Sequence, residues 1–239
     1  MKTILYKSES RGHADHGWLN SYHTFSFANY YDPARMNFGV LRVLNDDHVA
    51  AGMGFGRHPH DNMEIISIPL FGDLEHQDSM GNKTVIKEGD VQSMSAGTGI
   101  FHSEKNKNND KAVKFLQIWI LPKKRNIPPT YDQITMKLED RLNKFQQIVS
   151  PNPEDDGVSI NQDAWFNITT LEAGKSLTYK LHDPEKNGVY AFVLEGDVNI
   201  NGTALERRDG LGISESDTLE VQAESDTQLL LMEVPMSIQ

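Results

Sequence analysis

The sequence contains no cysteine among its 239 residues. This absence excludes disulfide bonds, thiolate nucleophiles, iron–sulfur clusters and zinc sites built on sulfur. Any metal must therefore be bound by histidine, aspartate or glutamate. Eight of the nine histidines lie before residue 132 and only His182 follows it, so metal chemistry is expected in the first half of the chain.

Long apolar runs are also missing. The longest, such as residues 229–232, fall far short of the roughly 20 residues that a membrane-spanning helix needs. Residues 1–6 are too few for the apolar segment of a secretory signal. We therefore expect a cytoplasmic protein without a membrane partner.

Positive charge is scarce, with 23 Lys and Arg against 34 Asp and Glu and a net charge of -11. Residues 1–132 hold 15 charges of each sign, whereas residues 133–239 hold 8 positive and 19 negative ones. The second half carries all of the excess. Because phosphate backbones are bound through Lys and Arg, direct nucleic-acid binding is not expected.

Short β-rich runs separated by Gly, Asn, Asp and Pro turns make up most of the chain. With few long stretches of helical periodicity between them, they predict an all-β fold, a sandwich or barrel. The clearest predicted strands are residues 38–44, 63–70, 83–87, 113–121, 166–171, 190–194, 198–200 and 227–234.

A chain of this length suits one large β domain or two domains of roughly 100 to 130 residues. The Pro-rich residues 122–129 are typical of an interdomain connection, and apolar residues at helical spacing predict a helix over residues 138–147. We therefore divide the chain into an N-terminal domain, residues 1–132, and a C-terminal domain, residues 133–239.

A weak internal repeat supports two domains. Residues 69–74 (PLFGDL) resemble residues 193–198 (VLEGDV) at an offset of 124, and both predict a strand, a Gly-Asp turn and a second strand. The same offset places His58 opposite His182 and His60 opposite Pro184. The second copy keeps at most one of these donors, so no metal is expected there.

The strongest functional signal is formed by His58 with His60 and by His102 with Glu104. Side chains two residues apart on a strand share a face, so these four donors converge if the two strands face each other inside a barrel. Such donors suit iron, manganese, nickel, copper or zinc, and four protein ligands leave two positions of a six-coordinate metal open for chemistry. The alternative is an ordinary surface strand, where a lone His-x-His pair is common.

Three glycines favour the metal interpretation. Gly52, Gly54 and Gly56 share parity with His58 and His60, so a regular strand would present an inward face without side chains just before the ligands. This pattern predicts a cavity beside the metal. A flexible loop or a degenerate phosphate-binding Gly-x-Gly would also account for the glycines, but the histidine pair follows where the helix of a phosphate motif would have to begin.

Residues 52–72 are similar to the first motif of the cupin superfamily and residues 89–106 to the second, with slight departures in spacing. Longer segments narrow the resemblance to the pirin family and cover most of residues 9–122. These are residues 11–18 (RGHADHGW), 23–33 (HTFSFANYYDP), 75–82 (EHQDSMGN) and 95–104 (SAGTGIFHSE).

The resemblance implies a bicupin fold, two jelly-roll barrels with a short helical connection and a metal in the N-terminal barrel only. It implies His58, His60, His102 and Glu104 as the ligands. The glutamate of the first motif, Glu64, is not expected to bind the metal in this family. On simple parity Glu64 would also point inward, so resemblance and strand alternation differ here, and we follow the family.

Bacterial pirin-like proteins are associated with quercetinase activity, in which O2 opens the ring of a flavonol and carbon monoxide is released. We hypothesise that a Lewis-acidic metal stabilises the deprotonated 3-hydroxyl while Glu104 acts as the catalytic base. One divalent transition metal is expected, iron(II), with copper, nickel, manganese, cobalt and zinc left open by the donor set.

The alternative function is that of a metal-dependent, redox-responsive regulatory protein that binds a protein partner without turnover. A cavity favours small-molecule chemistry, and the negative charge disfavours DNA.

Four further residues have no assigned catalytic role. His23, Phe25 and Phe27 share a strand face and are expected in an aromatic core rather than in a pocket. His76 is expected to be a hydrogen-bonded structural histidine, with support of a metal ligand as its lesser role.

Overall fold

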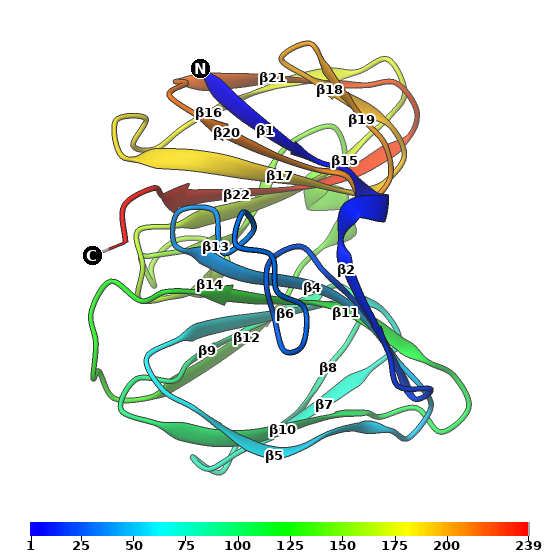
Figure 1. The fold of residues 1–239 in the computed structure, drawn as a ribbon, viewed down its shortest axis with the longest axis vertical. Helices are drawn as coiled ribbons and strands as arrows, with labels where there is room; N and C mark the ends of the chain where they lie inside the picture. The colour runs from blue at the N-terminus through cyan, green and yellow to red at the C-terminus, as the bar shows by residue number, and fades with distance from the viewer. Residues whose placement is uncertain (239) are drawn as a thin grey trace.

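The computed structural model describes residues 1–238 and is built almost entirely of strands, arranged as two stacked barrels (Figure 1). Each barrel consists of a seven-stranded sheet and a four-stranded sheet. The two seven-stranded sheets lie back to back in the middle of the molecule, and the four-stranded sheets form its two outer layers (Figure 1). The all-β bicupin expectation is therefore confirmed, and all eight predicted strand runs fall on strands.

The N-terminal barrel contains nearly all strands of the first half. Its seven-stranded sheet has the order β12 (Thr130–Thr135), β9 (Asp90–Ser95), β6 (Glu64–Phe71), β11 (Val113–Ile120), β4 (Leu41–Val49), β3 (Leu19–His23) and β2 (Gly12–Asp15). Its four-stranded sheet has the order β5 (Gly54–His60), β10 (Ile100–Asn106), β7 (Leu74–Asp78) and β8 (Lys83–Ile86).

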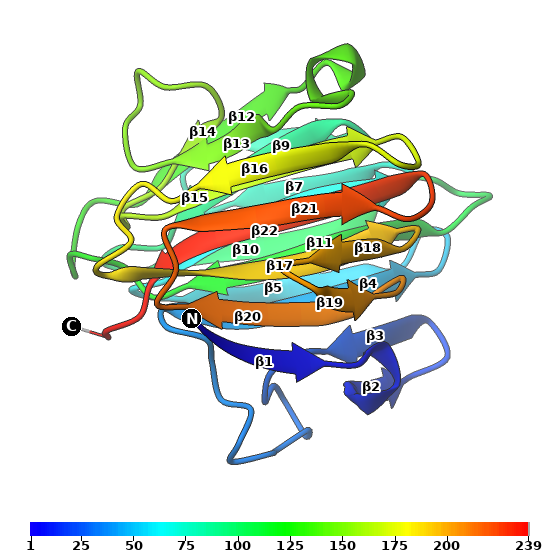
Figure 2. The same ribbon diagram turned by 90° about the horizontal axis from the view of Figure 1, so that it is seen from above.

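The C-terminal barrel repeats this plan. Its seven-stranded sheet has the order β1 (Lys2–Tyr6), β20 (Gly210–Ser214), β17 (Asn187–Glu195), β22 (Thr227–Pro235), β15 (Trp165–Leu171), β13 (Gln146–Ser150) and β14 (Val158–Ser159). Its four-stranded sheet has the order β16 (Ser176–Lys180), β21 (Thr218–Ala223), β18 (Val198–Ile200) and β19 (Thr203–Leu205). Strand β1 pairs with β20 at the edge of the sheet (Figure 2), so the beginning of the chain ties the two barrels together. A short 3-10 turn, Ser8–Ser10, follows β1.

The largest apolar core lies between the two barrels, because both central sheets are buried on both faces. Strand β11 shows how alternation divides the side chains: Leu116 and Ile118 join the core between the barrels, whereas Gln117 and Trp119 line a cavity inside the N-terminal barrel. The periodicity of two in β11 therefore builds the interdomain core on one face and the wall of a cavity on the other.

The internal repeat corresponds to two equivalent turns. Gly72 and Asp73 separate β6 from β7, and Gly196 and Asp197 separate β17 from β18, as predicted. The φ angles of the two glycines are 76° and 81°, in the left-handed region, and a Cβ on Gly196 would collide with the carbonyl oxygen of Asp226. Glycine is therefore required in both copies.

The predicted helix over residues 138–147 is wrong in extent. The structure has only a 3-10 turn, Leu138–Arg141, and β13 already begins at Gln146. Asn143 takes a positive φ of 54°, which ends any helix, and Leu138 and Leu142 are exposed rather than packed. Helical spacing without a surface to bury does not hold a helix in water. The domain boundary at residue 132, which falls within β12, stays a prediction.

Candidate metal centre

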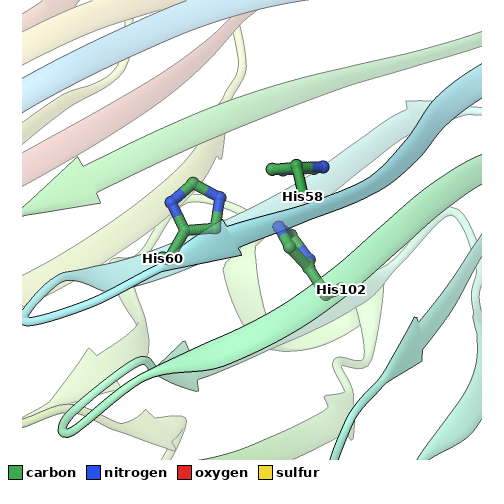
Figure 3. A group of neighbouring side chains, drawn as sticks. All are labelled: His58, His60 and His102. Atoms are coloured by element: carbon green, nitrogen blue, oxygen red, sulfur yellow. The ribbon is translucent and has the colours of Figure 1, made fainter.

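Three histidine side chains converge inside the N-terminal barrel (Figure 3). His58 and His60 lie on β5, and His102 lies directly opposite His58 on β10 in the antiparallel register. The ring centroids are separated by 4.4 Å for His58 and His102 and by 4.9 Å for each of the other two pairs. One donor nitrogen from each ring lies within 4.8 Å of the others. Alternation along β5 and pairing with β10 thus bring together three of the four predicted ligands.

The protonation of two of these rings, His60 and His102, suits a metal. Burial lowers the pKa of His60 to about 4 and that of His102 to about 3, so both rings are neutral at pH 7 and offer a lone pair. Nδ1 of His58 lies 2.8 Å from the carbonyl oxygen of Gly56. If Nδ1 carries the proton and donates it there, Nε2 is left free to bind a metal.

His102 gives the clearest test of whether these residues fit a bound metal ion. Its side chain is buried, and among residues 1–238 neither ring nitrogen has a hydrogen-bond partner. A buried polar ring without any partner costs about 1–3 kcal/mol. Coordination of a divalent ion between the three rings would give the lone pair of one of these nitrogens a partner, so the residues present fit a metal of intermediate hardness.

Glu104 lies two residues beyond His102 and is held by its neighbours. The Gln117 side-chain amide donates to both carboxylate oxygens, at 2.9 and 2.8 Å, and the Ser67 hydroxyl lies 3.2 Å from one of them. A carboxylate oxygen of Glu104 and ring nitrogens of His102 and His76 lie within 4.8 Å of one another, whereas Glu104 does not belong to the group formed by the three converging histidines. Glu104 therefore adjoins the histidine cluster through His102.

His76 is closer to the site than the sequence indicated. It lies on β7 directly opposite Glu104, is fully buried, and its ring centroid is 5.4 Å from that of His102. Its Nε2 lies 3.2 Å from Asp78, which agrees with the predicted hydrogen-bonded role. The signal that places it here is the pairing of β7 with β10, a long-range contact that the local sequence does not contain.

The predicted cavity beside the histidines is present, but the glycines do not form it, because β5 contains a bulge. Between the pair of His102 with His58 and the pair of Glu104 with Phe55, β5 has one residue more than β10. This extra residue reverses the parity. Phe55 takes the inward position and lines the cavity, whereas Gly52, Gly54 and Gly56 line a groove on the outer face of the same sheet.

Glu64 lies away from the histidines, so the inward direction expected from parity is also wrong. Its buried carboxylate accepts hydrogen bonds from the Ser95 hydroxyl, at 2.5 Å, and from the backbone N–H of Asn161, at 3.0 Å. Burial raises the pKa of Glu64. The contact with Asn161 connects the first barrel to the second half of the chain, which is a structural role.

A cavity of about 340 Å³ opens beside the histidine cluster. This volume lies in the range of small-molecule sites. Its apolar lining includes Leu19, Phe27, Phe55 and Trp119, and Trp119 packs edge-on to His60 at 4.9 Å. The cavity can therefore hold a flat aromatic compound against the metal donors. It is formed by large side chains arranged around a space, and not by the glycines.

The segment that follows β3 contributes to both core and cavity. Phe25 packs in the core between the barrels, as expected, whereas His23 and Phe27 line the cavity. Among the lining residues that were not predicted from the sequence are Ser21, Asn45 and Asp47. The available signal was the pair of polar residues at alternate positions of β4, between the buried Val43 and Val49 on the same face.

Comparison with known families finds a match in each half of the chain. Residues 5–120 match the family model described as Pirin, and residues 147–234 match the model described as the quercetinase C-terminal cupin domain. No helix within residues 1–238 has the length and apolar character needed to cross a membrane.

Individual relatives match along nearly the whole chain. The chain is 43% identical over 231 residues to quercetin 2,3-dioxygenase of Escherichia coli, which covers 97% of this chain and 98% of the relative. It is 43% identical over 223 residues to a pirin-like protein of Caulobacter vibrioides, covering 93% and 95%. The crystal structure of the E. coli bacterial pirin YhhW in complex with nickel(II) superimposes with a TM-score of 0.93 at 41% identity, covering 99% and 100%.

Proposed function

Because this chain belongs to the pirin family, we propose that it is a metal-dependent dioxygenase that opens a flavonol ring with O2 and releases carbon monoxide. The proposed ligands are His58, His60, His102 and Glu104. The observation that carries the proposal is an aromatic-lined cavity that ends on a cluster of three converging histidines. A protein that only bound a partner through its surface would have no need of such a cavity.

The metal is proposed to be a single divalent ion in the N-terminal barrel. Both groups of metal-donor side chains found among residues 1–238 belong to that barrel, and a related pirin holds nickel(II). We propose iron(II) as the resident metal. Because the same imidazole and carboxylate donors bind copper, nickel, manganese, cobalt and zinc, the identity has to be measured.

The chain's own residues prepare the substrate. Phe27, Phe55 and Trp119 line the cavity with aromatic faces and edges, which bind a flat ring system and exclude water. When bound, the metal supplies Lewis-acid stabilisation of the deprotonated 3-hydroxyl. Glu104 would hold the metal through one carboxylate oxygen and accept the proton of that hydroxyl on the other, and the Gln117 amide keeps the carboxylate oriented.

The test is oxygen uptake and carbon monoxide release with quercetin, measured per bound metal ion on metal-replete protein and on metal-replete Glu104→Gln. The variant retains the size of the side chain but lacks the basic oxygen, so we expect turnover to fall by about 10²–10⁴-fold. Glu139→Gln, an exposed glutamate in the connection between the barrels, is the matched control and should turn over normally.

Two results would contradict the proposal in different ways. Equal rates for Glu104→Gln and the unmodified protein would remove Glu104 from the role of base. Absence of oxygen uptake with every metal would remove the dioxygenase function. A pull-down that then changed between iron(II) and iron(III) protein would favour the regulatory alternative.

A further inference from the structure

Four buried polar side chains form one wall of the cavity, which we call the polar wall. Ser21 and His23 on β3 lie opposite Asp47 and Asn45 on β4, as two cross-strand pairs in register. All four line the cavity and are between 2 and 5% exposed. Because paired residues on neighbouring strands share a face, the wall is a continuous polar surface inside the barrel.

The polar wall is only partly satisfied by the protein itself. The Ser21 hydroxyl donates a hydrogen bond to Asp47, but no Lys or Arg forms an ion pair with this carboxyl among residues 1–238. In the same part of the chain, Nδ1 of His23 and Oδ1 of Asn45 are buried without a hydrogen-bond partner. Each such atom is unfavourable in the interior unless a ligand or water supplies its missing partner. A surface that was only structural would be expected to pair these groups internally.

The position of the wall determines what it can touch. It belongs to the seven-stranded sheet of the N-terminal barrel, and the histidine donors belong to the facing four-stranded sheet (Figure 1). Leu19, Phe27, Phe55 and Trp119 line the same cavity. An occupant thus meets metal donors on one sheet, polar groups on the other, and apolar or aromatic side chains around its rings.

We propose that the polar wall is a recognition subsite for the hydroxyl groups of the substrate and makes the cavity selective for polyhydroxylated aromatic compounds. This inference rests on the proposed function, because it takes a flavonol as the compound held at the metal. The carbonyl oxygen of Asn45 accepts from a phenolic hydroxyl, and the Asp47 carboxyl and the His23 ring can each accept or donate.

The electrostatics of the wall agree with this role. Burial raises the pKa of Asp47 to about 7 and lowers the pKa of His23 to about 4. Neither group therefore carries a full charge at pH 6 to 7. Neutral, hydrogen-bonding groups suit a neutral polyphenol, whereas a wall of fixed charges would suit an ionic compound.

The first experiment needs no variant. Protein loaded with nickel(II) is titrated in the absence of oxygen with quercetin and with 3-hydroxyflavone, which keeps the 3-hydroxyl and 4-keto groups but lacks the other four hydroxyls. One hydrogen bond to a buried polar group contributes about 1–1.5 kcal/mol, so we expect Kd to be at least about tenfold lower for quercetin. Simple apolar burial would favour 3-hydroxyflavone instead.

Variants then assign the selectivity to the wall. Asn45→Leu removes an acceptor at similar volume, and His23→Phe keeps an aromatic ring without nitrogen. Each should raise the Kd for quercetin by about tenfold and leave the Kd for 3-hydroxyflavone unchanged. Tyr22→Phe is the matched control, because Tyr22 lies between the wall residues of β3 but is exposed on the other face. Metal content and thermal unfolding verify that each variant is folded.

The outcomes separate this inference from the proposed function. Selective binding of quercetin that both wall variants abolish supports the subsite, even if no oxygen is consumed afterwards. Equal affinity for the two flavonols overturns the subsite, and oxygen uptake in that case still supports the dioxygenase. If neither flavonol binds, both proposals fail.

Discussion

Replacing Asp47 with asparagine is expected to make the stability of the metal-free protein less sensitive to rising pH. The carboxyl is fully buried on β4, and this burial is the main reason why its pKa rises from 3.8 to about 7. The charge on Glu104 adds to the shift, and the hydrogen bond from Ser21 partly offsets it. Asparagine has the same shape and can keep the Ser21 hydrogen bond, but it does not titrate.

The sign follows from which state binds the proton. Between pH 4 and pH 7 the unfolded chain has lost the Asp47 proton while the folded protein retains it, so raising the pH favours unfolding. Below pH 4 both states are protonated and the effect vanishes, and above pH 7 it is complete. A shift of about three pKa units, at about 1.4 kcal/mol each, corresponds to a cost on the order of 4 kcal/mol at pH 8.

Urea unfolding of metal-free protein at pH 5.5 and pH 8 measures this cost. About half of it is already present at pH 5.5, so the stability of Asp47→Asn relative to the unmodified protein should increase by about 2 kcal/mol between the two conditions. Taking the difference between proteins cancels the other titrating groups. Asp110→Asn, at an exposed carboxyl, should show no such increase. If the free energies of unfolding of Asp47→Asn and the unmodified protein differed by the same amount at both pH values, the reasoning would be refuted.

Three further predictions concern the metal site and one turn. His102→Ala should lower the affinity for the metal by more than the 10- to 100-fold that is typical when a residue supporting a ligand is lost. Elemental analysis after dialysis measures the metal that remains bound. Gln117→Leu removes the amide that orients Glu104, so it should retain metal but lower kcat with quercetin by about 10- to 100-fold; an unchanged kcat would contradict the positioning role. Gly196→Ala should lower the free energy of unfolding more than Gly174→Ala, because both glycines have positive φ but only Gly196 is crowded by backbone.

The local sequence pattern was sufficient to predict features that depend on a single strand. The strand runs were predicted correctly because turn residues and β-rich composition are local properties. The convergence of His58, His60 and His102 followed from simple alternation combined with the assumption that two strands are paired. Helical spacing at residues 138–147 failed because Leu138 and Leu142 have no surface to pack against, and only a 3-10 turn forms there.

The cavity depends on information that no single strand contains. The bulge in β5 is defined only by the register against β10. It places Phe55, and not the glycines, on the inner face of the sheet. The polar wall likewise exists only when β3 pairs with β4 in one particular register. A shift by one residue would turn Asn45 and Asp47 out of the cavity. The local sequence thus predicts that His58 and His60 share a face, whereas the approach of His102 and the composition of the polar wall both depend on long-range pairing.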